Sequence, residues 1–294
     1  MLDFQKSSPK AASQPERFSI VIPTWNNLAY LQLLVRSLRE NSAFRHQIIV
    51  VVNEGRDGTL DWVRAQPDLD WVFFPENAGI CYALNACRPL VRTDFFAYFN
   101  DDMYACPGWD EALWREIGDI GHRSFFLSST MIEPTETGNA CVVVRNFGSE
   151  PADFQEDKLL AEFAALPKNN WQGATWPPNV VPLELWDLVG GYSVEFSPGM
   201  YSDPDFSKKL WDAGVRLFKG VGASRVYHFG SKSTRRARRN RGSDTFLRKW
   251  GIPSSLFIRR HLRRGQDWDG PLAEPVLTWA DQLKIRWKKW QSLV

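Results

Sequence analysis

Two short groups of carboxylates in this 294-residue sequence have the composition and spacing to do chemistry. Asn100-Asp101-Asp102 directly follows the apolar segment 95–99, and Asp203-Pro204-Asp205 opens a segment with helical spacing. Adjacent carboxylates repel each other unless a cation or hydrogen-bond donors compensate, and Mg²⁺ or Mn²⁺ bridging phosphates is a common compensation. A tight turn, which Asn and Asp also favour, is the alternative for residues 100–102.

The second group has two interpretations of its own. Carboxylates in a first helical turn cap the helix and interact favourably with its dipole. Two of them in so short a span can also divide the work, one capping the helix and the other acting as a general base. His228 ends an apolar segment ahead of a Gly/Ser loop. A lone histidine in such a place is more often a structural hydrogen-bonding group than a ligand.

The segments that must position these groups alternate between strand and helix. The apolar runs 18–23, 47–52, 71–74 and 95–99 predict buried strands, and helical spacing follows at 28–41, 59–66 and 83–90. Such alternation predicts βαβ units and a mostly parallel central sheet flanked by helices. Polar clusters at 24–27, 53–57 and 100–102 follow three strand ends. Because ligands bind at the carboxyl ends of such strands, these clusters predict one shared crevice.

The rest of the chain continues the α/β pattern and ends in a basic region. Helices are predicted at 183–188 and 203–213, and short strands at 216–220 and 224–227. Residues 1–229 carry a net charge of −9 and residues 230–294 a net charge of +11. The run Lys232–Arg241 suits a phosphate clamp, a solvated loop or nucleic acid. We expect no nucleic-acid partner, because the body is acidic and no nucleic-acid-binding motif accompanies the run.

The last segment has apolar residues at steps of three and four, with basic residues between them. This stripe holds Val276, Trp279, Ala280, Leu283, Trp287, Trp290 and Val294. A basic helix of this kind could lie on an anionic membrane surface through residues 276–294, pack on the body, or join a second subunit in a homo-oligomer. With 14 Trp in the chain, sugar stacking is a further use for aromatic rings.

Several classes of protein lack support in the sequence. No phosphate-loop, GxGxxG or GxSxG motif is present, and no run of 18 apolar residues predicts a membrane span. The polar opening segment does not resemble a signal peptide, and the four cysteines show no CxxC spacing. The expectation is a cytoplasmic protein, with peripheral attachment to the inner face of the cell membrane as an extension of it.

The order of the motifs resembles the inverting family-two glycosyltransferases of GT-A fold, of the bacterial surface-polysaccharide type. The similar stretches, covering about residues 18–234, are VIPTWNN (21–27), VVNEGRDGT (51–59), ENAGICYALN (76–85), YFNDDMYACPGW (98–109), the stretch 185–214 and HFGSKST (228–234). The resemblance implies a GT-A-like nucleotide-binding fold and a sugar transferred from a nucleotide-sugar by a single displacement.

Carried across by position, the resemblance implies a role for each of several residues. Asp203 would be the general base, and Asp102 and His228 would hold Mn²⁺ or Mg²⁺. The nucleotide-sugar crevice would comprise Pro23, Thr24, Asn26, Asn53, Glu54, Asp57, Asn77 and Asp101. On the acceptor side, which would take a saccharide or lipid-linked acceptor, the candidates are Trp171, Trp176, Tyr201 and Asp205. The sequence departs from the family pattern at Asn100 and Ser202, which stand where acidic residues are usual, and in a loop after Asn53 that is one residue shorter.

These predictions divide the chain into three parts. Residues 1–17 are expected to form a flexible tail, and residues 18–234 a glycosyltransferase domain with a nucleotide-sugar half (18–110) and an acceptor half (111–234). Residues 235–294 are expected to form a basic, helical C-terminal extension. Two other functions stay open from the residues alone. One is a sugar-phosphate nucleotidyltransferase, and the other is a non-enzymatic protein that binds polyanions or nucleotide-sugars.

Overall fold

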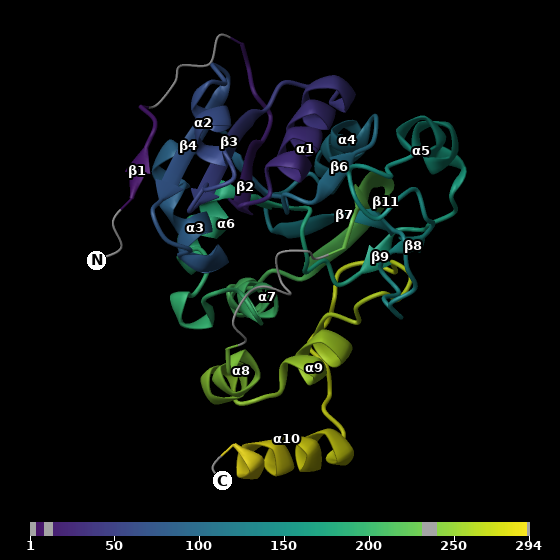
Figure 1. Cartoon of the computed structure of the whole chain (residues 1–294). Helices are drawn as coiled ribbons and strands as arrows, with labels where there is room; N and C mark the ends of the chain where they lie inside the picture. Colours follow the sequence, from purple (N-terminus) through teal and green to yellow (C-terminus); the bar gives the residue numbers. More distant parts are fainter. Residues whose placement is uncertain (1–3, 9–13, 231–239, 293–294) are drawn as a thin grey trace.

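A computed structural model of the chain describes residues 4–8, 14–230 and 240–292. Its centre is an 11-stranded sheet in which nine strands follow the order β1-β4-β3-β2-β5-β10-β7-β11-β6, with β8 beside β7 and β9 beside β11 (Figure 1). The strands are β1 (Gln5–Lys6), β2 (Ser19–Trp25), β3 (Gln47–Asn53), β4 (Leu69–Phe74), β5 (Phe95–Tyr98), β6 (Met103–Ala105), β7 (Phe125–Glu133), β8 (Val143–Val144), β9 (Trp171–Gln172), β10 (Asn179–Pro182) and β11 (Leu217–His228).

The sheet has a parallel half and a mixed half. Strands β4, β3, β2 and β5 are parallel neighbours, as the alternating pattern predicts. Beyond them β10 runs antiparallel to both β5 and β7, while β11 is parallel to β7 and antiparallel to β6. A central α/β sheet is therefore confirmed, but its mostly parallel character belongs to the first hundred residues.

Helices cover both faces of the sheet. The described helices are α1 (Leu28–Asn41), α2 (Thr59–Arg64), α3 (Gly79–Ala86), α4 (Trp109–Ile120), α5 (Glu156–Glu162), α6 (Leu183–Val189), α7 (Ser202–Asp212), α8 (Gly242–Trp250), α9 (Ser254–Leu256) and α10 (Trp279–Gln291), with single turns at η1 (Arg88–Leu90), η2 (Phe163–Ala165), η3 (Val194–Phe196) and η4 (Phe257–His261).

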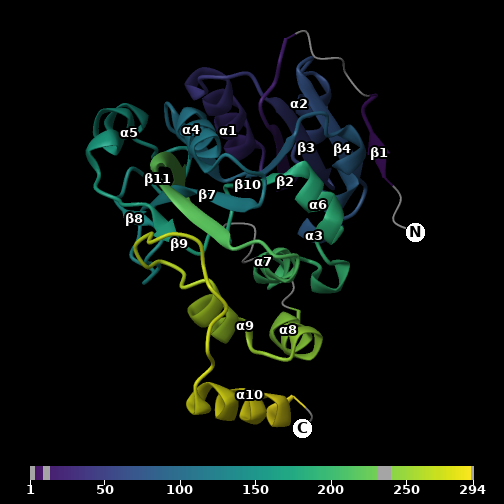
Figure 2. The ribbon, with the colours of Figure 1, turned by 180° about the vertical axis from the view of Figure 1, so that it is seen from behind.

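Alternate residues of each parallel strand face opposite helix layers, as the pleat requires. Ile20 and Ile22 of β2 pack in one core with α1, α2 and α4, whereas Val21 packs in the other core with α3, α6 and α7. Figures 1 and 2 show the two layers from opposite sides. This double burial explains why the sequence of each parallel strand is continuously apolar.

Two predictions about local structure were wrong in detail. The segments 216–220 and 224–227 form one strand, β11, whose register with β7 shifts between Val221 and Arg225. Within the predicted flexible tail, Gln5 and Lys6 pair with β4 as an edge strand. A two-residue polar strand leaves no periodic signal in a sequence, so the pattern could not have found it.

The C-terminal segment is attached to the body by a shared core. Phe246 of α8, Phe257 of η4 and Leu272 are buried in the same cluster as α6 and α7. In both views α8 and α9 lie below the sheet, and α10 lies farthest from it (Figures 1 and 2). Of the basic run Lys232–Arg241, only the last two residues fall within the described residues, and Ser231–Thr234 of the late motif also lie outside them.

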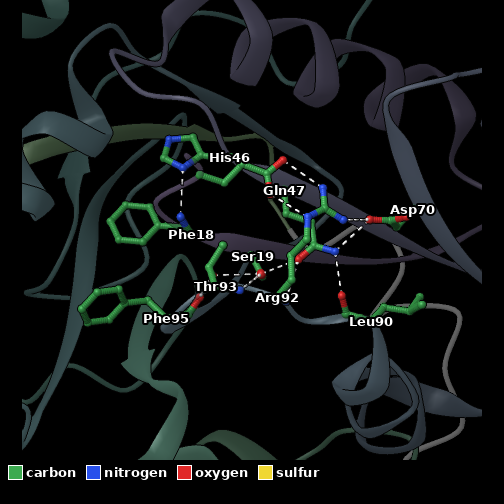
Figure 3. Close-up of polar contacts among 10 residues, drawn as sticks. Phe18, Ser19, His46, Gln47, Asp70, Leu90, Arg92, Thr93 and Phe95 are labelled. Carbon is green, nitrogen blue, oxygen red and sulfur yellow. Dashed lines mark hydrogen bonds and ion pairs between the residues drawn. The ribbon is translucent and has the colours of Figure 1, made fainter. Parts of the chain in front are cut away.

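A buried polar network closes the amino ends of the parallel strands (Figure 3). The Ser19 hydroxyl donates to Gln47 Oε1 at 2.5 Å, and the Gln47 amide donates to Asp70 Oδ2 and to the Leu90 carbonyl, both at 2.8 Å. Arg92 Nη1 completes the network with a 2.6 Å ion pair to Asp70. Side-chain bonds of this network thus link β2, β3, β4 and the segment before β5, in addition to the backbone hydrogen bonds of the sheet.

Candidate active site

The opposite ends of the same strands open into a cavity of about 710 Å³. Ten of the residues predicted from the sequence line it, namely Pro23, Thr24, Asn53, Asn77, Asp101, Asp102, Trp176, Tyr201, Asp203 and His228. They come from the exits of β2 and β3, the loop ahead of α3, the β5–β6 link, the segment before β10, the start of α7 and the end of β11. The fold thus gathers residues that are up to 205 positions apart in the sequence.

On the nucleotide side, amide side chains shape the backbone around the cavity. Asn53 Oδ1 accepts from the Ala78 amide at 3.0 Å, and Asn77 Oδ1 accepts from the Gly79 amide at 2.9 Å. Gly79 has φ +77°, and a Cβ there would lie 2.6 Å from Pro198 Cα, so only glycine fits this contact. The Thr24 hydroxyl is buried at the cavity and makes no hydrogen bond with the described residues.

Three predicted nucleotide-side residues lie outside the cavity lining and brace the loops behind it. Asn26 donates to Glu54 Oε2 at 3.1 Å, and both residues have positive φ, of 48° and 62°. Asp57 accepts from the Leu28 amide at 2.9 Å and from the Thr59 amide at 3.2 Å, so it caps the starts of α1 and α2. Although burial opposes the change, hydrogen bonds from Thr59 and Leu28 lower the pKa of Asp57.

Asp102 and His228 are brought together by strand pairing. The antiparallel register of β6 and β11 aligns Met103 with His228, which places the preceding Asp102 beside the imidazole. Asp102 Oδ1 lies 3.4 Å from His228 Nε2, and Glu133 Oε1 lies 2.9 Å from His228 Nδ1. Burial acts to lower the pKa of His228, but the Asp102 and Glu133 carboxylates together raise it to about 10.

The chemistry of these donors fits a divalent cation that is shared with a phosphate ligand. His228 Nε2 makes no hydrogen bond within the described residues and faces Asp102, while Nδ1 is oriented by Glu133. Metal-binding histidines commonly use one nitrogen for the metal and the other for a carboxylate. Among the described residues no group of three or more His, Cys, Asp or Glu is placed to hold a metal alone. Mg²⁺ is often held by one or two carboxylates together with substrate phosphates, so a protein pair is a sufficient anchor.

Asp203 stands at the start of α7, apart from the Asp102–His228 pair in the chain. Tyr201, just before the helix, has φ 71°, an unusual conformation for a bulky residue that turns the chain into α7. The Tyr192 hydroxyl donates to Asp203 Oδ1 at 3.1 Å, and the Tyr192 ring stacks on Phe206. Burial raises the pKa of Asp203 to about 7, against the smaller opposing effect of the Tyr192 hydrogen bond. A carboxyl group with this pKa can accept a proton near neutral pH.

The acceptor-side predictions separate into two pairs. Trp176 and Tyr201 line the cavity, but Trp171 and Asp205 do not. Trp171 is buried, with its Nε1 donating to Thr130 Oγ1 at 2.9 Å and its ring against Gly220, where a Cβ would lie 1.8 Å away. Asp205 is fully buried and accepts from Trp250 Nε1 at 2.8 Å, with Lys249 Nζ 3.0 Å away. These two residues have structural partners instead of a place in the cavity.

Sequence reasoning missed several cavity residues. Glu133, at the end of β7, and Ser254, Ile258 and Arg264, in the C-terminal segment, all line the cavity. Glu133 could have been suspected as a carboxylate at a strand exit. The other three residues reach the cavity only through tertiary packing, and no sequence motif distinguishes them.

Part of the chain is similar in sequence to known glycosyltransferases. Residues 19–152 match the family described as Glycosyl transferase family 2. This match takes in a little under half of the chain, including the strands and loops of the nucleotide side. Over 124 residues, 40% of its length, this chain is 31% identical to pre-mycofactocin glycosyltransferases from two strains of Mycobacterium tuberculosis, CDC 1551 and H37Rv. The chain spans about a quarter of the length of these curated relatives.

Solved structures share the fold at low sequence identity. S. aureus TarS 1-349 is 16% identical with a TM-score of 0.52, over 72% of this chain and 60% of that one. GalNAc-T7, solved with UDP, GalNAc and Mn²⁺, is 13% identical with a TM-score of 0.58, over 94% of this chain and 55% of that one. The described part of the chain therefore has a GT-A-like fold. The family match ends at residue 152, so Asp203 and His228 lie beyond it.

Proposed function

We propose that this protein is a metal-dependent, inverting glycosyltransferase that moves a sugar from a nucleotide-sugar to a hydroxyl of a saccharide or glycolipid. The observation that carries the proposal is that Asp203 and the Asp102–His228 pair line one cavity from separate elements. Inversion by single displacement needs one base, and it needs a separate site where a bound cation can neutralise the leaving diphosphate. The arrangement supplies both.

Asp203 would receive the proton of the acceptor hydroxyl. The acceptor oxygen then forms its bond to the anomeric carbon as the bond from that carbon to the diphosphate oxygen breaks, and the bonding electron pair leaves with the diphosphate. The Tyr192 hydrogen bond keeps the Asp203 carboxylate oriented. Asp102 and His228 would hold Mn²⁺ or Mg²⁺, with Asp101 beside them in the cavity lining. When bound, the cation neutralises the negative charge that develops on the leaving group.

A nucleotide-sugar donor is supported by what the structural relatives bind. TarS has been solved with UDP-GlcNAc and with UDP, and GalNAc-T7 with UDP, GalNAc and Mn²⁺. In this cavity, we propose that the nucleotide lies against Pro23 and Thr24 at the end of β2 and against Asn53 at the end of β3. We therefore assign residues 18–110 to the donor and residues 111–234 to the acceptor, with a cavity wall added by the C-terminal segment 235–294.

The C-terminal helix α10 bears on where in the cell the enzyme would act. No helix in the described ranges is long and apolar enough to cross a membrane. On α10, however, Trp279, Trp287 and Trp290 are 74%, 57% and 58% exposed. Asp281, the one acidic residue of α10, is buried in ion pairs with Arg259 and Arg260 at 2.8 and 2.9 Å. The solvent-facing charges of the helix are thus cationic, in Lys284, Arg286, Lys288 and Lys289.

This combination of exposed tryptophan and lysine suits the surface of an anionic bilayer. We propose peripheral attachment to the inner face of the cell membrane, where lipid-linked acceptors are accessible. Packing of α10 against a second copy of the chain is the competing outcome, and a measurement of mass in solution separates the two.

The function is tested by donor binding followed by transfer. UDP-, GDP-, dTDP- and CMP-sugars are screened with Mn²⁺ for an increase in Tm, because a ligand stabilises the state that it binds. Release of nucleoside diphosphate from the stabilising donor is then measured with and without EDTA. We expect one base class to raise the Tm and EDTA to stop turnover. Turnover that is indifferent to chelation would contradict the metal role, and stabilisation by none of the donors would contradict the function.

A further inference from the structure

Arg264 is a partly buried cation at the cavity, and no described residue is an anionic partner for it. Its side chain lines the cavity, and its Nη1 atom is buried without a hydrogen bond. Within residues 4–8, 14–230 and 240–292 we find no carboxylate in ion-pair contact with it. A buried charge that lacks a partner is costly, and most such groups in proteins are paired.

The backbone holds this side chain in place at some cost. Arg263, the preceding residue, has φ 49°, and the Gly265 amide donates to the Gln172 carbonyl at 2.9 Å. A Cβ on Gly173 would lie 2.7 Å from Arg264 Cα, so the loop sits directly against this glycine. Strain of this kind persists where the surroundings fix a conformation, and it gathers at binding sites. The position of Arg264 is therefore determined by the fold.

Trp176 supports the guanidinium. The centre of the Arg264 guanidinium lies 3.7 Å from the centroid of the Trp176 ring, a cation–π contact. One face of this ring is therefore covered by Arg264 and is closed to a sugar. Trp176, expected from the sequence to stack on an acceptor, instead presents a cation to the cavity.

The surroundings of Arg264 belong to the acceptor half. Trp176 precedes β10, Gly173 follows β9, and Gly265 packs against Ala140. Burial lowers the pKa of Arg264, and Cys141 is the one ionisable group among the described residues that opposes this effect.

We propose that Arg264, backed by Trp176, binds an anionic group of the acceptor, a carboxylate or a phosphate carried on the sugar. This assignment rests on the proposed function, and it narrows the acceptor to acidic saccharides. A guanidinium pairs with either anion through two parallel hydrogen bonds. The pairing offsets the cost of the buried charge only when the acceptor is present, so neutral sugars are discriminated against.

The test uses the 294-residue chain with Mn²⁺ and saturating UDP, or the nucleotide of whichever donor class stabilises the protein. Three probes are titrated by calorimetry: methyl glucuronide, glucose 6-phosphate and methyl glucoside. We expect wild-type protein to bind at least one anionic probe about tenfold or more tightly than the neutral one. Arg264→Gln should abolish that preference, and Arg264→Lys should retain part of it. Arg263→Gln, which alters a neighbouring arginine paired with Asp269, is the matched control and should keep the preference.

Two further measurements make the outcome decisive. The affinity for UDP and Mn²⁺ without sugar should be the same in wild type and Arg264→Gln, and the Tm of the variant should not fall, since an uncompensated charge is removed. Equal binding of all three probes by wild type overturns the proposal. A loss of UDP affinity in Arg264→Gln also overturns it, because the arginine then serves the donor phosphates. Failure of wild type to bind UDP or any other nucleotide of the four donor classes refutes the proposed function instead, and is read before any sugar is added.

Discussion

The two ends of the parallel strands β2, β3, β4 and β5 use polar residues in opposite ways. At the amino ends, Ser19, Gln47 and Asp70 bond to each other and to Arg92, so polar atoms of one strand meet polar atoms of the next. At the carboxyl ends, the Thr24 hydroxyl and His228 Nε2 are buried at a cavity without a hydrogen bond in the described residues. Buried polar groups that satisfy each other stabilise a fold, whereas those left for a ligand mark a site.

The largest effect is expected where the carboxyl-end cavity loses its base. Asp203→Asn should lower kcat about 10²–10⁴-fold, because the amide cannot accept the proton of the acceptor hydroxyl. Donor affinity should be unchanged in a calorimetric titration. Asp212→Asn, at the exposed far end of the same helix, is the control and should keep full turnover. Full activity of Asp203→Asn would remove Asp203 from the catalytic site.

At the amino ends we expect a substitution to lower stability and to leave nucleotide binding unchanged. Asp70→Ala removes the acceptor shared by Gln47 and Arg92, and should lower the free energy of unfolding by about 2–3 kcal/mol. Arg92 keeps its ion pair with Glu16 at 2.7 Å, which limits the loss. Urea unfolding measures the change, and the UDP affinity of the folded variant should match that of wild type. A change in that affinity with no loss of stability would contradict the division between the two ends.

The raised pKa of Asp203 makes both turnover and stability depend on pH. Because the pKa of Asp203 is raised to about 7, kcat/KM should fall about tenfold per pH unit below that value, where the base is protonated. The same shift has a cost. The folded state binds this proton more tightly than the unfolded state, so stability decreases as pH rises from about 4 to 7.

Asp203→Asn should therefore be more stable than wild type at pH 8 by up to about 4 kcal/mol, and close to it at pH 4. Thermal unfolding at the two pH values measures this. A variant that is less stable than wild type at pH 8 would mean that the carboxylate supports the fold, as Asp70 does at the amino ends.

The smallest effect is expected at α10, which is remote from both ends. Trp287→Ser with Trp290→Ser should weaken co-flotation with vesicles rich in anionic lipid about tenfold, and salt should weaken the wild-type interaction. Leu188→Ser, on a similarly exposed residue of α6, is the control. Wild type that binds zwitterionic and anionic vesicles equally, or that forms a dimer lost in the double variant, would contradict the assignment to an anionic surface.

The sequence predicted what local pattern encodes. The bounds of α1 were predicted at 28–41 and observed at Leu28–Asn41, and strands β2 to β5 were each predicted within two residues. The polar strand exits were expected to share a crevice because parallel strands end at one edge. The resemblance also pointed to ten residues that line the cavity.

What the sequence could not give depends on contacts between distant segments. Asp57 was expected in the nucleotide crevice, but it caps two helices, since the Leu28 amide lies within its reach only in the folded chain. Trp171 and Asp205 have the right residue types for acceptor binding. In the fold, however, Trp171 donates a hydrogen bond to Thr130, and Asp205 accepts one from Trp250. Arg264 has no motif around it, and only the packing of its loop on Gly173 turns it toward the cavity.

The ion pair between Asp205 and Lys249 ties α7, the helix that begins with Asp203, to α8. Asp205 lies two residues after Asp203 on α7, and its other partner, Trp250, ends α8, which packs against α10. The first turn of α7 is thus connected to α10 through α8. If α10 lies on a bilayer as proposed, we expect its attachment to shift the orientation of the Asp203 side chain through this short chain of contacts.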